Sequence, residues 1–364
     1  MTMSTTFTAP SPSFVSGVPT DGAARSFGAA APSTSMDARH WLKALSPFRE
    51  ARFGRSILEL AVTFVPFVIL WLSMWLSLGY SYWLCLLLSV PAAGFLVRLF
   101  MIQHDCGHGS FFPSRSLNDW VGRAIGVLTL TPYGHWRHAH AIHHATSGNL
   151  DDRGIGDVDT LTVREYEQLS GWAQWFYRLK RNPFFLLGLG APYLFILHHR
   201  LPTPQMRSKR EAWRSTMATN LAIAALAALA ILVVGLKDFL LIQLPITWLA
   251  SSIGVWLFFV QHQFEDGHWE KDDDWNVHAA AVHGSSHLHL PAVLRWFTAN
   301  IGVHHVHHLS SRIPSYRLDE VLRAHPELNG INRITLKDTF GCFRLALWDE
   351  SRGKLVSFKD AAAG

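Results

Sequence analysis

The stretch His135-Trp-Arg-His138-Ala-His140-Ala-Ile-His143-His144 is the most informative part of the sequence. Residues three or four apart share one face of a helix, so His140, His143 and His144 can point toward a common region. Neutral imidazole is the commonest protein ligand for metal ions. The stretch therefore predicts a helix that presents two or three imidazoles to a metal site.

Two other segments repeat this spacing far away in the chain. His104-Asp-Cys-Gly-His108 lies upstream, and His304-His-Val-His307-His308 lies downstream. Eight imidazoles at helical spacing are too many for one tetrahedral or octahedral ion, and about right for two ions that keep open positions. The three segments together predict a dinuclear site of nitrogen-ligated, redox-capable metal.

Other classes of metal site fit the sequence poorly. A zinc peptidase would need the run H-E-x-x-H on a helix, and the chain has none. Soluble di-iron bundles use paired Glu-x-x-His motifs from two helices. The chain has one match, Glu265-Asp-Gly-His268, whose Asp-Gly pair disfavours a regular helix. A carboxylate-bridged site is therefore not expected.

The three His segments resemble those of the membrane-bound fatty acid desaturases. That family has the patterns H-x(3,4)-H, H-x(2,3)-H-H and H-x(2,3)-H-H. The first segment continues as His108-Gly-Ser110, and the third stands within the stretch Ala299-Asn-Ile-Gly-Val-His-His-Val-His-His-Leu-Ser-Ser-Arg-Ile-Pro314. The residues in these two stretches are most similar to those of the bacterial Δ12/ω-type branch. The resemblance covers roughly residues 50 to 325.

The resemblance implies a chemistry as well as a fold. It implies two non-haem Fe ions, with O2 as co-substrate, and a ninth ligand at His262, which matches a family His after the last membrane pair. No catalytic residue beyond the metal ligands is expected. The implied reaction inserts a cis double bond into a long acyl chain, as in oleoyl-to-linoleoyl conversion at position 12. The acyl group would be carried by a lipid, by CoA or by acyl carrier protein.

Several polar residues near the ligands are candidates for a supporting role. Asp105, His135, His138 and His305 could orient ligands or substrate. The acidic residues that follow the second segment could pair with a nearby Arg or His, and the sequence does not specify the partner: Asp151, Asp152 and Asp157.

The composition is that of a membrane protein carried by one domain. The 364 residues are 49% hydrophobic and only 16% charged, and mean hydropathy is +0.13. The formal net charge of +5 comes without a nucleic-acid-binding motif, so a nucleic-acid partner is not expected. Three scattered cysteines cannot form a disulfide framework, which favours a reducing, cytoplasmic site.

Four apolar runs predict about four transmembrane helices: 60–79, 82–97, 219–236 and 239–260. The second should continue past a snorkelling Arg98 to carry His104 and His108 out of the bilayer. Segment 117–132 should lie in the interface. Segment 183–197 should be re-entrant, interfacial or a buried helix. Positive-inside flanks place both termini and all candidate ligands on the cytoplasmic face, in a bacterial inner membrane.

These features define the predicted organisation. Residues 1–40 form a disordered tail, 41–330 the membrane desaturase domain, and 331–364 a C-terminal cytoplasmic cap. The fold class is all-α, with a cytoplasmic helical cap that holds a His-ligated di-metal site. No haem or flavin module is recognisable in the sequence, so a separate donor, ferredoxin by its acidic character, should supply electrons to the basic cytoplasmic face.

Two alternatives remain open at this stage. The same di-iron scaffold could serve a hydroxylase, ketolase or acetylenase, and the oxidised product distinguishes these. A non-catalytic membrane metal-binding or transport protein would instead place ionisable residues inside the spans, along a path. Only Glu59 lies at the edge of a predicted span among the carboxylates, which disfavours the transport alternative.

Overall fold

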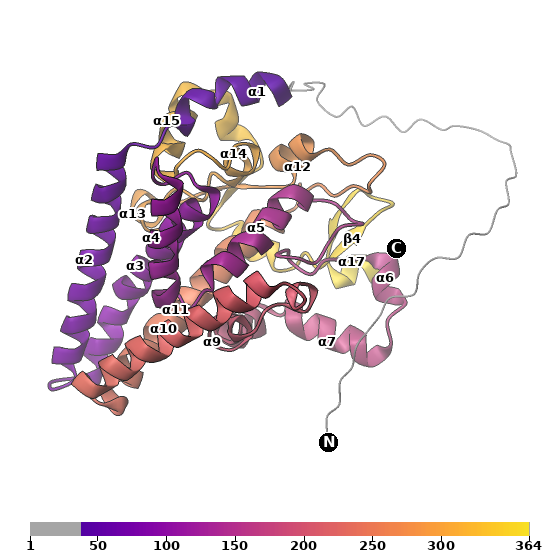
Figure 1. Ribbon diagram of the computed structural model, residues 1–364. Coiled ribbons are helices and arrows are strands. Elements are labelled where there is room, and N and C mark those ends of the chain that lie inside the picture. The colour runs from indigo at the N-terminus through magenta and orange to yellow at the C-terminus, as the bar shows by residue number, and fades with distance from the viewer. Residues whose placement is uncertain (1–37, 364) are drawn as a thin grey trace, which may run out of the picture. The chain divides into compact units, whose positions relative to one another are not determined.

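Long helices dominate the computed structural model, which describes residues 38–363 (Figure 1). Two helical hairpins form its core: α2 (Phe53–Ser77) with α3 (Tyr82–His108), and α10 (Arg210–Val234) with α11 (Leu236–His262). Helix α3 packs against both α2 and α11. The predicted tail lies outside the described residues, except that α1 (Ala38–Ala44) begins at its last three positions.

The four predicted spans correspond to these four helices. Each is long and apolar enough to cross a membrane. Helix α3 runs without a break to His108, as predicted, and the αL residue Gly109 (φ +67°) ends it there. Helix α10 begins at Arg210 rather than at residue 219, because its polar first turns continue the helix outside the apolar run.

A fifth apolar segment, Pro183–Met206, also meets the length and composition of a span. It consists of short helical pieces, including a π-helical turn at Leu186–Gly190. Just before it, Arg181 donates to Gln263 Oε1 at 3.0 Å, and just after it Lys209 Nζ lies 2.8 Å from His138 Nε2. Both ends therefore lie on the side where α3 and α11 end.

The middle of this segment reaches α11 well inside the hydrophobic region. The carbonyls of Leu187 and Gly188 accept hydrogen bonds from Ser252 and Trp248 at 2.7 and 2.8 Å. Those residues lie 10 and 14 positions before the end of α11, or about 15 and 21 Å along its axis. The segment thus begins and ends on one side, which fits the re-entrant alternative. Only 6% of the residues in its most apolar stretch are buried within the protein, so the buried-helix alternative is wrong.

Shorter elements form the cap around the ends of α3 and α11. Five short strands of the described chain belong to it besides the helices. Strand β1 (Leu161–Thr162) pairs parallel with β4 (Leu347–Asp349), β4 pairs antiparallel with β5 (Lys354–Val356), and β2 (His287–His289) pairs parallel with β3 (Arg333–Thr335). The remaining helices are η1 (Ser46–Arg49), α4 (Arg115–Leu128), α5 (Tyr133–Thr146), α6 (Val163–Glu167), α7 (Gly171–Arg181), α8 (Pro183–Phe185), η2 (Leu186–Gly190), α9 (Ala191–Ile196), η3 (His198–Arg200), η4 (Pro204–Met206), α12 (Val277–His283), α13 (Ala292–Phe297), α14 (His304–Leu309), η5 (Ser315–Arg317), α15 (Leu318–Ala324), η6 (Pro326–Gly330), α16 (Thr339–Cys342) and α17 (Phe358–Ala362).

A buried ion pair joins α2, α3 and α13 below the cap. Arg98 Nη2 contacts Glu59 Oε2, its Nε donates to Thr63 at 3.1 Å, and its guanidinium lies 4.0 Å from the ring centre of Trp296. Arg98 is only 5% exposed, so the predicted snorkelling is wrong. A carboxylate within reach neutralises the cation, and this removes the need to reach water.

Candidate metal centre

Four helices bring nine imidazoles together at the ends of α3 and α11. Helix α3 contributes two near its C-terminus, α5 three, α14 three, and α11 its last residue. They are the nine residues that the sequence motifs and the family resemblance indicated. They form two groups, in each of which the possible ligand atoms lie within 4.8 Å of one another: a five-His group of His104, His108, His140, His144 and His307, and a four-His group of His143, His262, His304 and His308.

Helices α5 and α14 each contribute to both groups. In α5, His140 and His144 join the five-His group and His143 the four-His group; in α14, His307 joins the five-His group and its two partners the four-His group. Successive residues are rotated by about 100° in a helix, so i and i+4 differ by only about 40° while i+3 and i+4 differ by about 100°. Three imidazoles of one segment therefore do not meet at one point, which corrects part of the sequence prediction.

Close packing of Tyr133 against α3 and α4 holds α5 in place. The Tyr133 hydroxyl, at the start of α5, donates to the Cys106 carbonyl of α3 at 2.8 Å and lies 3.0 Å from Asp119 of α4. A Cβ at Gly122 would lie 2.3 Å from the Tyr133 ring, so glycine is required at that position of α4. These contacts fix the rotation of α5, and with it the direction of its imidazoles.

The α14 helix is held from α11 and β2. Gln261, next to His262, donates to the Ile301 carbonyl at 3.0 Å. Gly302 lies so close to β2 that a Cβ there would be 2.4 Å from the Leu288 carbonyl oxygen. The segment that precedes α14 is thus anchored on two sides.

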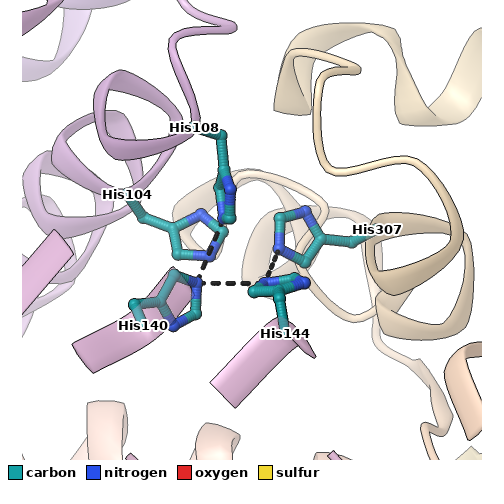
Figure 2. A group of neighbouring side chains, drawn as sticks. All are labelled: His104, His108, His140, His144 and His307. Atoms are coloured by element: carbon teal, nitrogen blue, oxygen red, sulfur yellow. Dashed lines mark hydrogen bonds between the residues drawn. The ribbon is translucent and has the colours of Figure 1, made fainter. Parts of the chain in front are cut away.

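Within each group the Nε2 atoms face one another (Figure 2 shows the five-His group). The Nε2 of His140 lies 3.1 Å from that of His108 and 3.1 Å from that of His144. In the four-His group, the Nε2 of His262 lies 3.2 Å from that of His143 and 3.0 Å from that of His304. An imidazole nitrogen has one proton or one lone pair, so it cannot satisfy two such neighbours by hydrogen bonding.

A shared cation would account for these short separations. An ion with bonds of about 2.1 Å to imidazole nitrogens separates adjacent ligand nitrogens by about 3.0–3.4 Å at bond angles of 90–109°. The observed Nε2–Nε2 distances of 3.0–3.2 Å fall in this range. The two groups also adjoin, with the stacked rings of His144 and His308 only 4.1 Å apart. The residues present therefore fit a pair of neighbouring metal ions.

Burial keeps the imidazoles of the cap in the form that binds metal. Removal from water, reinforced by the neighbouring imidazoles, lowers the pKa of two grouped rings in α5 and three in α14 well below the ordinary value. This holds for His140, His144, His304, His307 and His308. At neutral pH these rings are uncharged, and their lone pairs are available to a cation without loss of a proton.

The supporting residues named from the sequence lie around the groups rather than in them. Asp105 Oδ1 is 3.6 Å from His104 Nδ1, beyond hydrogen-bond reach, while its Oδ2 accepts from the Ser315 amide at 2.7 Å. His135 accepts from the Thr203 amide at 3.3 Å. His138 is exposed beside Lys209.

His305 faces away from both groups, as the helical spacing indicates. Its Nε2 donates to the Leu328 carbonyl at 2.9 Å, and burial lowers its pKa to about 3. The sequence did not single out Trp136, whose ring stacks on His140 at a centroid distance of 4.7 Å and an angle of 14°. It also left open the partner of Asp157, which the structure places against His143, with Oδ1 2.5 Å from Nδ1. No spacing rule could reveal a contact that depends on loop conformation.

Comparisons with known proteins agree with this site. A family model described as fatty acid desaturase matches residues 81–336. A fatty acid desaturase of Bacillus subtilis is 47% identical over 317 residues, which cover 87% of this chain and 90% of the relative. In Synechocystis, an sn-1 acyl-lipid omega-3 desaturase (ferredoxin) is 30% identical over 69% of this chain and 70% of its own length, and an sn-1 oleoyl-lipid 12-desaturase is 28% identical over 67% and 69%. The chain belongs to the fatty acid desaturase family of oxidoreductases.

Proposed function

We propose that the five-His and four-His groups each hold one iron ion and that the protein uses O2 to insert a cis double bond into a long acyl chain. The observation that carries this proposal is the pair of adjoining groups, built only of imidazole nitrogens whose short separations hydrogen bonding cannot explain. Bound iron would supply the redox capacity and the O2 activation. The protein supplies neutral ligands, a fixed separation and a dry environment.

The acyl chain would occupy an apolar hollow next to the five-His group. The hollow is partly open to its surroundings. Its α3 wall includes Phe100, one helical turn before His104, and Phe100 contacts Trp136 at a ring distance of 5.4 Å. Trp136 in turn stacks on His140, so an aromatic pair separates the hollow from the ligands. The lining residues are Leu96, Val97, Phe100, Met101, Leu128, Thr129, Leu130, Phe195, Thr247, Ala250, Ser251 and Gly254.

Filling the hollow tests this assignment. A Cβ at Gly254 would meet no atom within 4 Å, so there is space for a side chain to begin there, and Gly254→Leu would fill part of the hollow. We expect this variant to insert normally, to keep its metal and to lose activity on long chains. Gly188→Leu is the matched control, because Gly188 also has free space but does not line the hollow. If both variants lose activity equally, or if neither loses activity, the hollow is excluded as the acyl site.

The product decides between desaturation and its alternatives. The protein is expressed in a host of known lipid profile, and its fatty acids are analysed with and without added oleate. A new double bond supports desaturation, and conversion of oleate to a diunsaturated chain supports position 12. A hydroxylated or keto product without a new double bond rejects desaturation in favour of the hydroxylase or ketolase alternative, and a triple bond favours the acetylenase. Desaturation of a saturated chain rejects only position 12.

The transport alternative is weakened by Glu59. Its buried carboxylate in α2 forms an ion pair with Arg98 and a second one, at 2.6 Å, with Arg55. It is therefore part of a closed ion-pair network and does not line a path for ions.

The electron donor is proposed to be a small acidic protein such as ferredoxin, arriving at the cytoplasmic face of a bacterial inner membrane. Three relatives carry ferredoxin in their names. The net charge of +5 would attract an acidic partner. Turnover with purified ferredoxin and its reductase should fall as ionic strength rises, because salt screens such attraction. Turnover that does not depend on ferredoxin, or that rises with salt, contradicts this donor.

A further inference from the structure

Asp157 is the only carboxylate of the described chain within hydrogen-bond reach of a ring nitrogen of the nine grouped imidazoles. Its Oδ1 lies 2.5 Å from His143 Nδ1, and both side chains are nearly fully buried, at 5% and 1% exposure. The His143 Nε2 faces His262 in the four-His group. Asp157 thus holds the far side of an imidazole whose near side belongs to the proposed metal site.

The loop that carries Asp157 packs closely against α5. Gly156, the preceding residue, has φ +81°, and a Cβ there would lie 3.2 Å from both the Ala139 carbonyl oxygen and His143 Cβ. Glycine therefore permits both the left-handed backbone and the close approach. Arg153 clamps the loop by donating to the Thr160 carbonyl at 2.6 Å and to Glu165 at 2.6 and 2.9 Å.

The five-His group has no corresponding contact. Its nearest carboxylate, Asp105, is 3.6 Å from His104 Nδ1, and the His104 Nδ1 atom has no hydrogen-bond partner. In the four-His group, His304 Nδ1 also lacks a partner among described residues. Within the described chain, His143 is thus the one grouped imidazole that is hydrogen-bonded to a carboxylate. The two groups therefore differ in hydrogen bonding to a carboxylate as well as in ligand number.

We propose that Asp157 is a positioning residue that makes the two metal positions chemically unequal. The proposal rests on the proposed function only in taking both groups as metal sites. By accepting the Nδ1 proton, the carboxylate fixes the His143 tautomer, leaves Nε2 free for the metal, and makes the ring a stronger donor. The four-His position then binds its ion more tightly than four uncharged imidazoles would, although it has one ligand fewer than its neighbour.

Titration of the metal-free protein with Co²⁺, followed by its visible absorption, tests this without iron, O2 or turnover. The wild type should bind two equivalents. In Asp157→Asn, affinity for one equivalent should fall by about 10–100-fold, the usual cost of losing such a partner, while the other stays unchanged. Gly156→Ala should reproduce the effect, because its Cβ would push the loop away from His143.

The control is Asp159→Asn, in the same loop and with the same change in charge. Asp159 is 62% exposed and pairs with Lys180, so its loss should leave both equivalents unchanged. Unchanged Co²⁺ binding in Asp157→Asn, or equal weakening of both equivalents, overturns the role of Asp157. A wild type that binds no Co²⁺ at all instead contradicts the proposed function. Circular dichroism of each variant checks that its helices are intact.

Discussion

Two buried polar regions lie close together in this molecule, and they differ in how their polar atoms are satisfied. Around Arg98, each cationic nitrogen meets an oxygen: Glu59, Thr63 and the Trp296 carbonyl. In the His groups, Nε2 atoms meet other Nε2 atoms that cannot complete their bonding. Buried polar atoms that are all hydrogen-bonded within the protein stabilise the fold. Buried nitrogens that point at one another without such partners instead form a site that can bind an ion.

The largest effect should come from removing a ligand of the four-His group. His304→Ala leaves three imidazoles there, and we expect activity to fall by roughly a thousandfold or more, because the proposed reaction needs both metals. One metal should be lost per chain while the helix content is kept. His143→Ala and His308→Ala, in the same group, should behave alike, and so should His140→Ala in the five-His group. Full activity in any of these variants removes that residue from the ligand set.

Breaking the Arg98 network should have the opposite pattern. Glu59→Gln leaves a buried cation unpaired, and we expect a loss of about 3–5 kcal/mol in the free energy of unfolding. Metal content per folded chain should not change. Arg55→Gln removes the exposed partner of the same carboxylate, at 51% side-chain exposure, and should cost about 1 kcal/mol or less. Denaturation in detergent measures both; equal losses would mean that Arg98 does not depend on Glu59.

Acid should destabilise the metal-free protein. Burial lowers the pKa of His287, outside the metal groups, to about 4, and it lowers those of the cap ligands in the same direction. Below a pH of about 6.5, the ordinary pKa of histidine, imidazoles of the unfolded chain become protonated while the buried ones stay neutral. The free energy of unfolding therefore falls as pH falls from 6.5 toward 4. Unfolding at pH 7 and pH 5 measures this. Stability that is constant or higher at pH 5 contradicts the neutral, buried state of these rings.

The smallest effect should come from the exposed histidine of the second segment. His138 contacts Lys209 at the surface, and within the described chain it makes no hydrogen bond to a grouped imidazole. His138→Ala should change activity by about twofold or less, within the range typical of surface substitutions. A loss comparable with that of His140→Ala would place His138 in the reaction.

Much of the site could be predicted because helical spacing fixes how residues within one helix are related. The i, i+3 and i+4 pattern of His140, His143 and His144 placed three imidazoles on adjoining directions of one helix, and repetition in two more segments indicated two ions. Their division between the groups could not be predicted. It depends on how α5 and α14 are rotated against α3 and α11, which contacts such as Tyr133 with Cys106 determine.

The fold shows the same limit. Apolar runs located the four long helices, whereas the breaks in segment 183–197 left a re-entrant, an interfacial and a buried course open. The partner of Arg98 lies 39 residues away, on the neighbouring helix, and no local pattern reveals it. The short strands of the cap were missed for a similar reason: β2 and β3 pair across 46 positions and have only three residues each.

Metal analysis of the purified protein tests the di-iron site most directly. Iron, zinc and other metals are quantified per chain, and Mössbauer spectra of protein grown on ⁵⁷Fe resolve the iron environments. Two adjoining all-imidazole groups of unequal ligand number predict about two irons per chain, in two different environments of equal abundance. A single zinc per chain, or iron in one environment only, would contradict it.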